Sequence, residues 1–117
     1  MDRPLELTFR DITPSVALKA LIQSCVTRLE QRYDSIIGCH VTVELHYNVH
    51  RAGYVANVLI DVEVPDEMLL VRNQNGHDGG ALAAVRHAFD SAVRQVEEYK
   101  TRRKIRAELC ESIDAMT

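Results

Sequence analysis

The sequence predicts an α+β fold, a two-layer sandwich in which two helices cover one face of a four-stranded sheet in the order β-α-β-β-β-α. Three observations support this prediction. Four segments alternate apolar and polar residues with a period of two, which is typical of strands buried on one face. Two longer segments repeat apolar residues at steps of three and four, which is typical of amphipathic helices. A chain of 117 residues that is 46% hydrophobic can build one core but not two.

The first strand and the first helix are predicted at the start of the chain. Over residues 4–10 apolar and polar side chains alternate, which predicts a strand. Thr13 is then the expected N-cap of a helix and Pro14 its first residue, because a threonine hydroxyl accepts from a free N–H group and proline tolerates the first helical position. This helix is expected to end near residues 33–34. Its apolar stripe consists of Leu18, Leu21, Ile22, Cys25, Val26 and Leu29.

Three further strands are predicted in the middle of the chain. Alternation predicts strands over 36–48 and 54–64, joined by a hairpin turn in which Gly53 can supply a positive φ. A tight turn then leads into a short strand over 68–72. Residues 73–80 contain no apolar side chain and are predicted to form a loop.

The longest predicted element is a helix over residues 81–106. One face is apolar and should pack on the sheet, whereas the opposite side is rich in Lys and Arg. Beyond it the apolar pattern loses its period, so residues 107–117 are predicted to be a frayed helix end or a mobile tail. The predicted organisation is therefore one domain over 1–106 and a tail over 107–117. The apolar face of the long helix consists of Leu82, Val85, Phe89, Ala92, Val93, Val96 and Tyr99.

Charge is unevenly distributed along the chain. The formal net charge of −3 does not suggest a generally basic nucleic-acid binder, but residues 81–106 carry seven Lys and Arg against three Asp and Glu. Three widely spaced cysteines without a CxxC pair predict reduced thiols. No apolar run is long enough to span a membrane, and the N-terminus lacks the apolar region of a signal peptide. These features predict a soluble, cytoplasmic protein.

Neither an active site nor a metal or cofactor site is predicted. His40, His46 and His50 share one parity of a strand, but residues so far apart in an extended chain cannot meet at one zinc ion. Cys39 and His40 are neighbours on a strand and point to opposite faces, so they do not form a nucleophile and its base. The loop over 77–80 lacks the glycine spacing of a nucleotide-binding motif. The chain is therefore not expected to be an enzyme.

The basic side chains of the two helices give the strongest functional signal. If both helices pack side by side on the sheet, their outward Lys and Arg residues combine into one positively charged groove. Such a groove suits the phosphate backbone of folded RNA, which is recognised by shape rather than by base edges. The alternative is a solvated helix end whose cations complement the helix dipole. The candidate RNA-binding residues are Lys19, Arg28, Arg32, Arg86, Arg94, Lys100, Arg102, Arg103 and Lys104.

Three stretches of the sequence carry a resemblance to a known family. They are LELTFRDITPS over 5–15, LEQRYD over 29–34 followed by Ile36, and the stretch over 83–100 that contains AAV, RQV and YK. With these stretches in this order, the chain over about residues 4–106 resembles the ribosome hibernation factors, a family of ribosome-associated inhibitors once described as sigma-54 modulation proteins. The resemblance implies a fold like that of double-stranded-RNA-binding domains. It also implies binding in the small ribosomal subunit between head and platform, where the family occludes mRNA and tRNA positions in stationary phase or stress.

The resemblance implies roles for individual residues as well. Lys19 and Arg28 match basic family positions on the first helix, and Arg94, Lys100 and Arg102 match basic positions on the second. The long members add a C-terminal dimerisation domain, and this chain is expected to be too short to contain one. It therefore looks like a short-form member or a divergent relative with reduced affinity. The departures from the family pattern are Cys25, Ser91 and Glu98 at positions that are often basic, and residues 79–82 in place of an acidic-plus-tyrosine motif.

Two functional hypotheses follow. The first is a non-enzymatic factor that binds the decoding channel of the small ribosomal subunit and its 16S-type rRNA, and that inhibits translation and promotes hibernation under stress. It would need no cofactor, bind neither DNA nor membranes, and act as a monomer or a weak homodimer. The second is a protein-interaction module that uses the exposed sheet face or edge, with helix charges that only aid solubility. Added salt distinguishes the two, because it weakens phosphate binding steeply.

Overall fold

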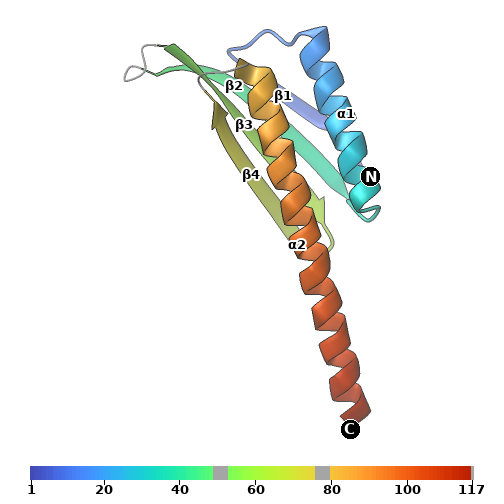
Figure 1. Cartoon of the computed structure of the whole chain (residues 1–117). Helices are drawn as coiled ribbons and strands as arrows, with labels where there is room; N and C mark the ends of the chain where they lie inside the picture. Colours follow the sequence, from blue (N-terminus) through green and yellow to red (C-terminus); the bar gives the residue numbers. More distant parts are fainter. Residues whose placement is uncertain (49–52, 76–79, 117) are drawn as a thin grey trace.

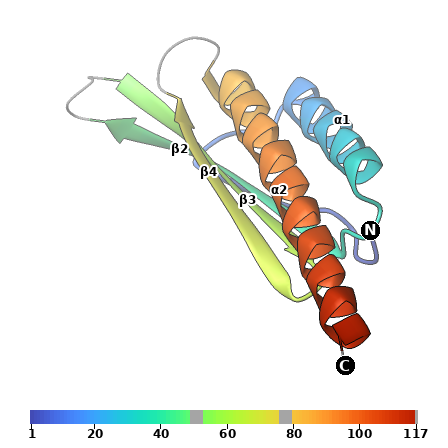
Figure 2. The ribbon, with the colours of Figure 1, turned by 60° about the horizontal axis from the view of Figure 1, so that its bottom comes forward.

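The computed structural model describes residues 1–48, 53–75 and 80–116, which form a four-stranded sheet and two helices. Both helices lie on one face of the sheet and leave the other face open (Figures 1 and 2). The predicted two-layer α+β fold is therefore confirmed. The elements are β1 (Glu6–Arg10), α1 (Val16–Arg32), β2 (Gly38–Asn48), β3 (Gly53–Val64), β4 (Glu67–Asn75) and α2 (Gly80–Met116).

The strand order of the sheet is β1-β2-β3-β4, so β1 and β4 are its edges. β1 is parallel to β2, with α1 as the connection between them, whereas β2, β3 and β4 are antiparallel to one another. Val41 pairs with Ile60, and Ile60 pairs with Val71 on the other side. This register aligns the alternating apolar side chains of neighbouring strands on the face that the helices cover.

The hydrophobic core lies between the sheet and the two helices. Phe89 on α2 and Ile22 and Leu29 on α1 are fully buried, together with the inward residues of β2 and β3. Every residue of the two predicted apolar stripes is in this core or packs against it. Burying one large apolar side chain completely stabilises the folded state by about 1.5–3 kcal/mol. The burial of these two stripes therefore determines how both helices lie on the sheet.

The start of α1 differs from the prediction. Ser15, not Thr13, is the N-cap, because its Oγ accepts a hydrogen bond from the backbone N–H of Leu18 at 3.0 Å. Pro14 therefore precedes the helix and is not its first residue. Both Thr13 and Ser15 satisfy the residue preference at a helix start, so only the hydrogen bond distinguishes them.

β4 is longer than predicted. Residues 73–75, expected in a loop, continue the strand and pair with residues 56–58 of β3. Ladder pairing thus overrides the weak strand preference of Asn and Gln. The rest of the predicted loop, residues 76–79, and the predicted turn at 49–52 lie outside the described residues. Between β3 and β4 the tight turn is observed, with Asp66 at a φ of 67°.

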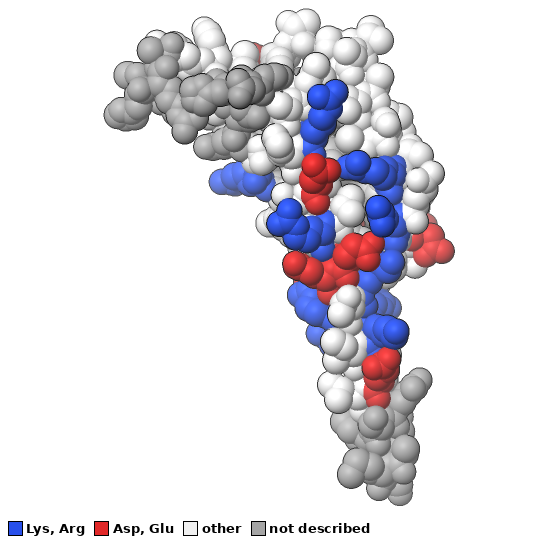
Figure 3. All heavy atoms as spheres, in the orientation of Figure 1, with Lys and Arg blue, Asp and Glu red and all other residues white. Residues whose placement is uncertain are grey.

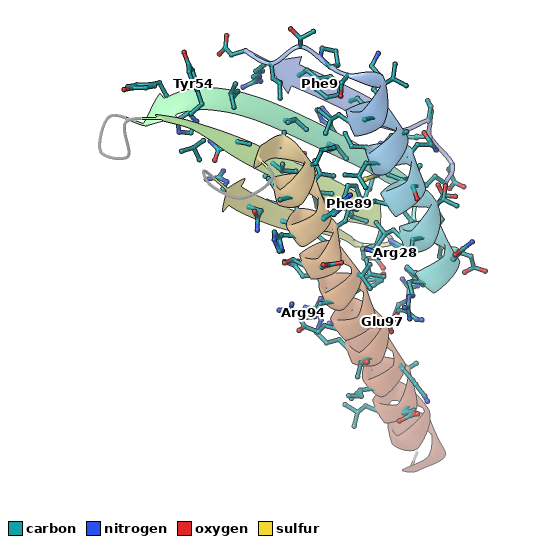
Figure 4. All side chains as sticks on the ribbon, turned by 45° about the horizontal axis from the view of Figure 1, so that its top comes forward. Phe9, Arg28, Tyr54, Phe89, Arg94 and Glu97 are labelled. Carbon is teal, nitrogen blue, oxygen red and sulfur yellow. The ribbon has the colours of Figure 1, made fainter. Side chains whose placement is uncertain are left out.

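Two tyrosines near the tip of the β2–β3 hairpin are exposed, although the alternation of side chains along their strands predicts them on the buried face. Tyr47 is 54% exposed and Tyr54 is 63% exposed. The two residues are paired across the hairpin, with ring centroids 5.5 Å apart in an edge-to-face arrangement. Figures 1 and 4 show the reason: this hairpin extends beyond the helix layer, so inward side chains there have no helix to contact.

α2 is helical from Gly80 to Met116 and so includes most of the segment expected as a frayed end or tail. It runs far past the sheet and α1 (Figure 1) and gives the molecule its longest dimension, 63 Å. A domain division at residue 106 stays a prediction. Among the residues described, no helix has both the length and the apolarity needed to cross a membrane.

Candidate nucleic-acid interface

The helix layer brings the predicted basic residues of both helices onto one side of the molecule. α1 and the first part of α2 lie side by side on the same sheet face and contact each other (Figures 1 and 2). Figure 3 shows Lys and Arg side chains gathered along the exposed side of this layer, with Asp and Glu side chains among them. The surface is therefore a mixed one in which cations predominate, rather than an unbroken positive patch.

Two of the nine candidate residues connect the two helices to each other. Arg28 points from α1 toward α2 (Figure 4), and its Nη2 lies 3.1 Å from Oδ1 of Asp90. Lys100 donates a hydrogen bond of 2.9 Å to the backbone carbonyl of Arg32 at the end of α1, and its Nζ lies 3.8 Å from Oε2 of Glu97. Lys100 thus satisfies one of the free carbonyl groups that every helix C-terminus carries. Both side chains stabilise the helix layer.

Two further candidates connect α2 to the β3–β4 turn. Arg102 forms an ion pair with Glu67 at 3.1 Å. Arg103 donates a hydrogen bond of 2.7 Å to the hydroxyl of Tyr99, which in turn donates one of 2.7 Å to the carbonyl of Pro65. Burial raises the pKa of the Tyr99 hydroxyl, so the hydroxyl keeps its proton and remains a donor. The Arg103 guanidinium therefore has one structural partner and keeps further N–H donors on its exposed side.

The Tyr99 hydroxyl should contribute measurably to stability. Tyr99→Phe removes the donor to Pro65 and the acceptor of Arg103, so we expect the free energy of unfolding to fall by about 1–2 kcal/mol. Urea denaturation measures this change. Tyr54→Phe is the matched control: Tyr54 is 63% exposed, and its loss of a hydroxyl should change stability by less than about 0.5 kcal/mol. Equal effects of the two substitutions would contradict the role of this hydrogen-bond chain.

The other five candidates are exposed side chains that form no hydrogen bond or ion pair with any described residue. Each can therefore contact a ligand without breaking an internal interaction. They lie on α1 and α2 and cover the length of the helix layer. We call them the free cations: Lys19, Arg32, Arg86, Arg94 and Lys104.

Among the residues that the structure describes, the remaining reactive side chains do not assemble into a site. Cys39 is buried, and burial raises its pKa to about 12, so it is a thiol and not a nucleophilic thiolate at neutral pH. His40 lies on the open face, 2.8 Å from the Thr8 hydroxyl, as the strand parity predicted. Within the described residues no three His, Cys, Asp or Glu side chains are placed to hold a metal ion. His50 and residues 77–79, also considered above, lie outside the described residues.

The family model described as sigma 54 modulation protein / S30EA ribosomal protein matches residues 5–104. The chain belongs to this family. The resemblance found in the sequence is thereby confirmed, and the match includes all nine candidate residues. Of the departures from the family pattern, Cys25 is buried in the core, so this position cannot contribute to an exposed basic surface.

Solved structures share the fold of this S30EA family member. A ribosomal subunit interface protein from Coxiella burnetii is 18% identical, with a TM-score of 0.68 over 83% of this chain and 97% of that one. The N-terminal domain of Thermus thermophilus Protein Y is 21% identical, with a TM-score of 0.60 over 80% of this chain and 94% of that one. At these identities the likeness concerns the fold alone. No curated protein matches the sequence significantly.

Proposed function

We propose that this chain is a non-enzymatic factor that binds the small ribosomal subunit through rRNA phosphates and inhibits translation under stress. The observation that carries the proposal is the gathering of Lys and Arg side chains along the exposed side of the helix layer (Figure 3), where the free cations of α1 and α2 are exposed. The family description names a ribosomal protein, and the Coxiella burnetii protein is named for a ribosomal subunit interface. The decoding channel, which the family resemblance implies, is part of the proposal, as are the cytoplasm and the absence of a cofactor, which the sequence predicts.

The engaged and the free cations would have different roles in this function. Arg28, Lys100 and Arg102 hold α1, α2 and the β3–β4 turn in position, and Arg103 donates to Tyr99, whose hydroxyl contacts that turn. The free cations would then contact phosphates from a rigid surface. Binding would therefore cost little backbone conformational entropy. Acidic side chains among the cations, such as Glu98, would disfavour a ligand whose phosphates do not match the surface.

Co-sedimentation with purified small ribosomal subunits at two salt concentrations tests the proposal. We expect binding at low salt and, if five phosphates are contacted, a loss of affinity on the order of a few hundredfold between about 50 and 200 mM salt. The steep dependence arises because each contact releases counterions from the RNA. Absence of the protein from the ribosomal pellet at low salt would refute the proposal.

Binding of another protein chain is the second candidate function. The observation that favours it is the exposed edge strand β4, with large apolar side chains at Met68 and Leu70. Strand pairing depends little on salt, so binding that persists unchanged at high salt would favour this candidate.

A further inference from the structure

β4 presents an unpaired and partly apolar edge. It is nine residues long, whereas the opposite edge strand, β1, has five. Met68 is 52% exposed and Leu70 is 59% exposed on the outer side of β4. A long edge strand with exposed apolar side chains is a template for pairing with another strand, and Lys or Pro residues that would block pairing do not occur in β4.

A groove of about 690 Å³ runs between β4 and α2. Gln95 reaches across it and donates a hydrogen bond of 3.2 Å to the backbone carbonyl of Leu70. That carbonyl therefore faces the groove, and the alternation of backbone groups along a strand gives Met68 and Arg72 the same orientation. The Nε2 group of Gln95 thus donates to the same carbonyl oxygen that would accept from a backbone N–H group of an added strand.

Two opposite charges lie on the groove side of α2, one helical turn apart. Arg94 projects from the side of α2 that faces away from α1 (Figure 4), and Glu98 lines the same groove. Both side chains are exposed, and neither forms an ion pair with a residue that the structure describes. Gln95, between them in sequence, is level with Leu70. A two-fold axis through Leu70 would therefore pass between the two charges.

We propose that two copies of this chain associate through antiparallel pairing of their β4 strands. Leu70 lies opposite Leu70 of the second copy at the two-fold axis, and the two sheets form one continuous sheet of eight strands. Arg94 of each α2 faces Glu98 of the other, so the charges that are unpaired in one chain complement each other in the pair. The side chain of Gln95 is displaced, and a backbone N–H group replaces it.

The oligomeric state of the full chain tests this arrangement. Light scattering during size exclusion should show a rise to twice the mass of one chain as protein concentration increases. Leu70→Lys should leave a monomer, because it places two ammonium groups together at the axis. Leu109→Lys is the matched control: Leu109 is also 59% exposed, lies near the C-terminal end of α2 and not on β4, and its replacement should preserve the dimer.

A charge exchange tests the contact between the helices. Arg94→Glu and Glu98→Arg, each alone, place like charges together twice in the dimer and should raise its Kd about tenfold. The double variant restores opposite charges and should recover the original Kd. A double variant as weak as the single ones would refute this register.

A cysteine cross-link tests the strand register. Residues opposite each other on antiparallel strands have Cα atoms about 4.5–5.5 Å apart, within the range that a disulfide bridges. Leu70→Cys in a Cys110→Ser background should therefore form a covalent dimer on mild oxidation, whereas Met68→Cys should not. A wild-type chain that remains monomeric at every concentration would overturn the pairing of two copies and leave β4 to a strand of another protein. Because the readout is the mass of the free protein, this outcome is independent of ribosome binding.

Discussion

Replacing Lys19 and Lys104 together by Glu should lower the affinity for the small ribosomal subunit by more than about 100-fold. Each lysine is expected to lose a charge-assisted hydrogen bond to phosphate worth about 1.5–3 kcal/mol, and each new carboxylate repels the RNA. The melting temperature should not change, because neither lysine has a described partner. Co-sedimentation and thermal denaturation of the same preparation measure the two quantities.

The matched control for this variant reverses two cations on the sheet. Arg10→Glu with Arg72→Glu changes the net charge by the same amount, but both residues lie on the strands and away from the helix layer. This control should bind ribosomal subunits within a few-fold of the wild-type affinity. If both variants lost binding equally, net charge rather than the surface of α1 and α2 would determine the interaction. Since neither Lys19 nor Lys104 lines the groove beside β4, the loss of binding expected for the double lysine variant does not depend on chain pairing, whereas Arg72 of the control lies on β4.

Phe89→Ala should be among the most destabilising single substitutions in this chain. Phe89 lies at the centre of the core between the helices and the sheet and is 0% exposed (Figure 4). Truncating a buried phenylalanine removes its burial energy and leaves a cavity, at a cost of about 3–5 kcal/mol. Domains of this size are stable by only about 5–15 kcal/mol, so a large fraction of the stability should be lost.

Urea denaturation monitored by circular dichroism measures the effect of Phe89→Ala. The midpoint should fall while the slope of the transition remains close to that of the wild type. Leu109→Ala serves as the control, because this exposed side chain should contribute less than about 0.5 kcal/mol. A loss below about 1 kcal/mol for Phe89→Ala would show that the core rearranges to fill the space.

The fold could be predicted from the sequence because its signals are local. Apolar residues recur every two residues in each strand and every three to four residues in each helix. These periods identified all six elements of the fold. The errors in the bounds of elements occurred where a local pattern was ambiguous or was overridden by pairing. Thr13 and Ser15 are equally good N-caps by type, and the polar residues 73–75 became part of a strand because β3 lies beside them.

The candidate site could be predicted only in part. Counting Lys and Arg residues located the basic surface but could not separate free cations from engaged ones. Arg28 and Asp90 are 62 positions apart in the chain, and no sequence pattern links them. Tyr99 was predicted as a core residue, but its hydrogen bond to Pro65 was not anticipated. Its position at the end of the apolar stripe, four residues before Arg103, was the available signal.

The contact between α1 and α2 also determines when the basic surface can first exist. The partners of this contact, such as Arg28 and Asp90, are separated by 62 residues, so α1 is made long before the helix it packs against. At a synthesis rate of about 5–20 residues per second, several seconds pass between the synthesis of α1 and that of α2, and during this time the apolar stripe of α1 has no helix to pack against. A nascent chain still in the exit tunnel therefore lacks the joined rows of cations. Until α2 has left the exit tunnel, the protein cannot present this surface to the ribosome that is making it.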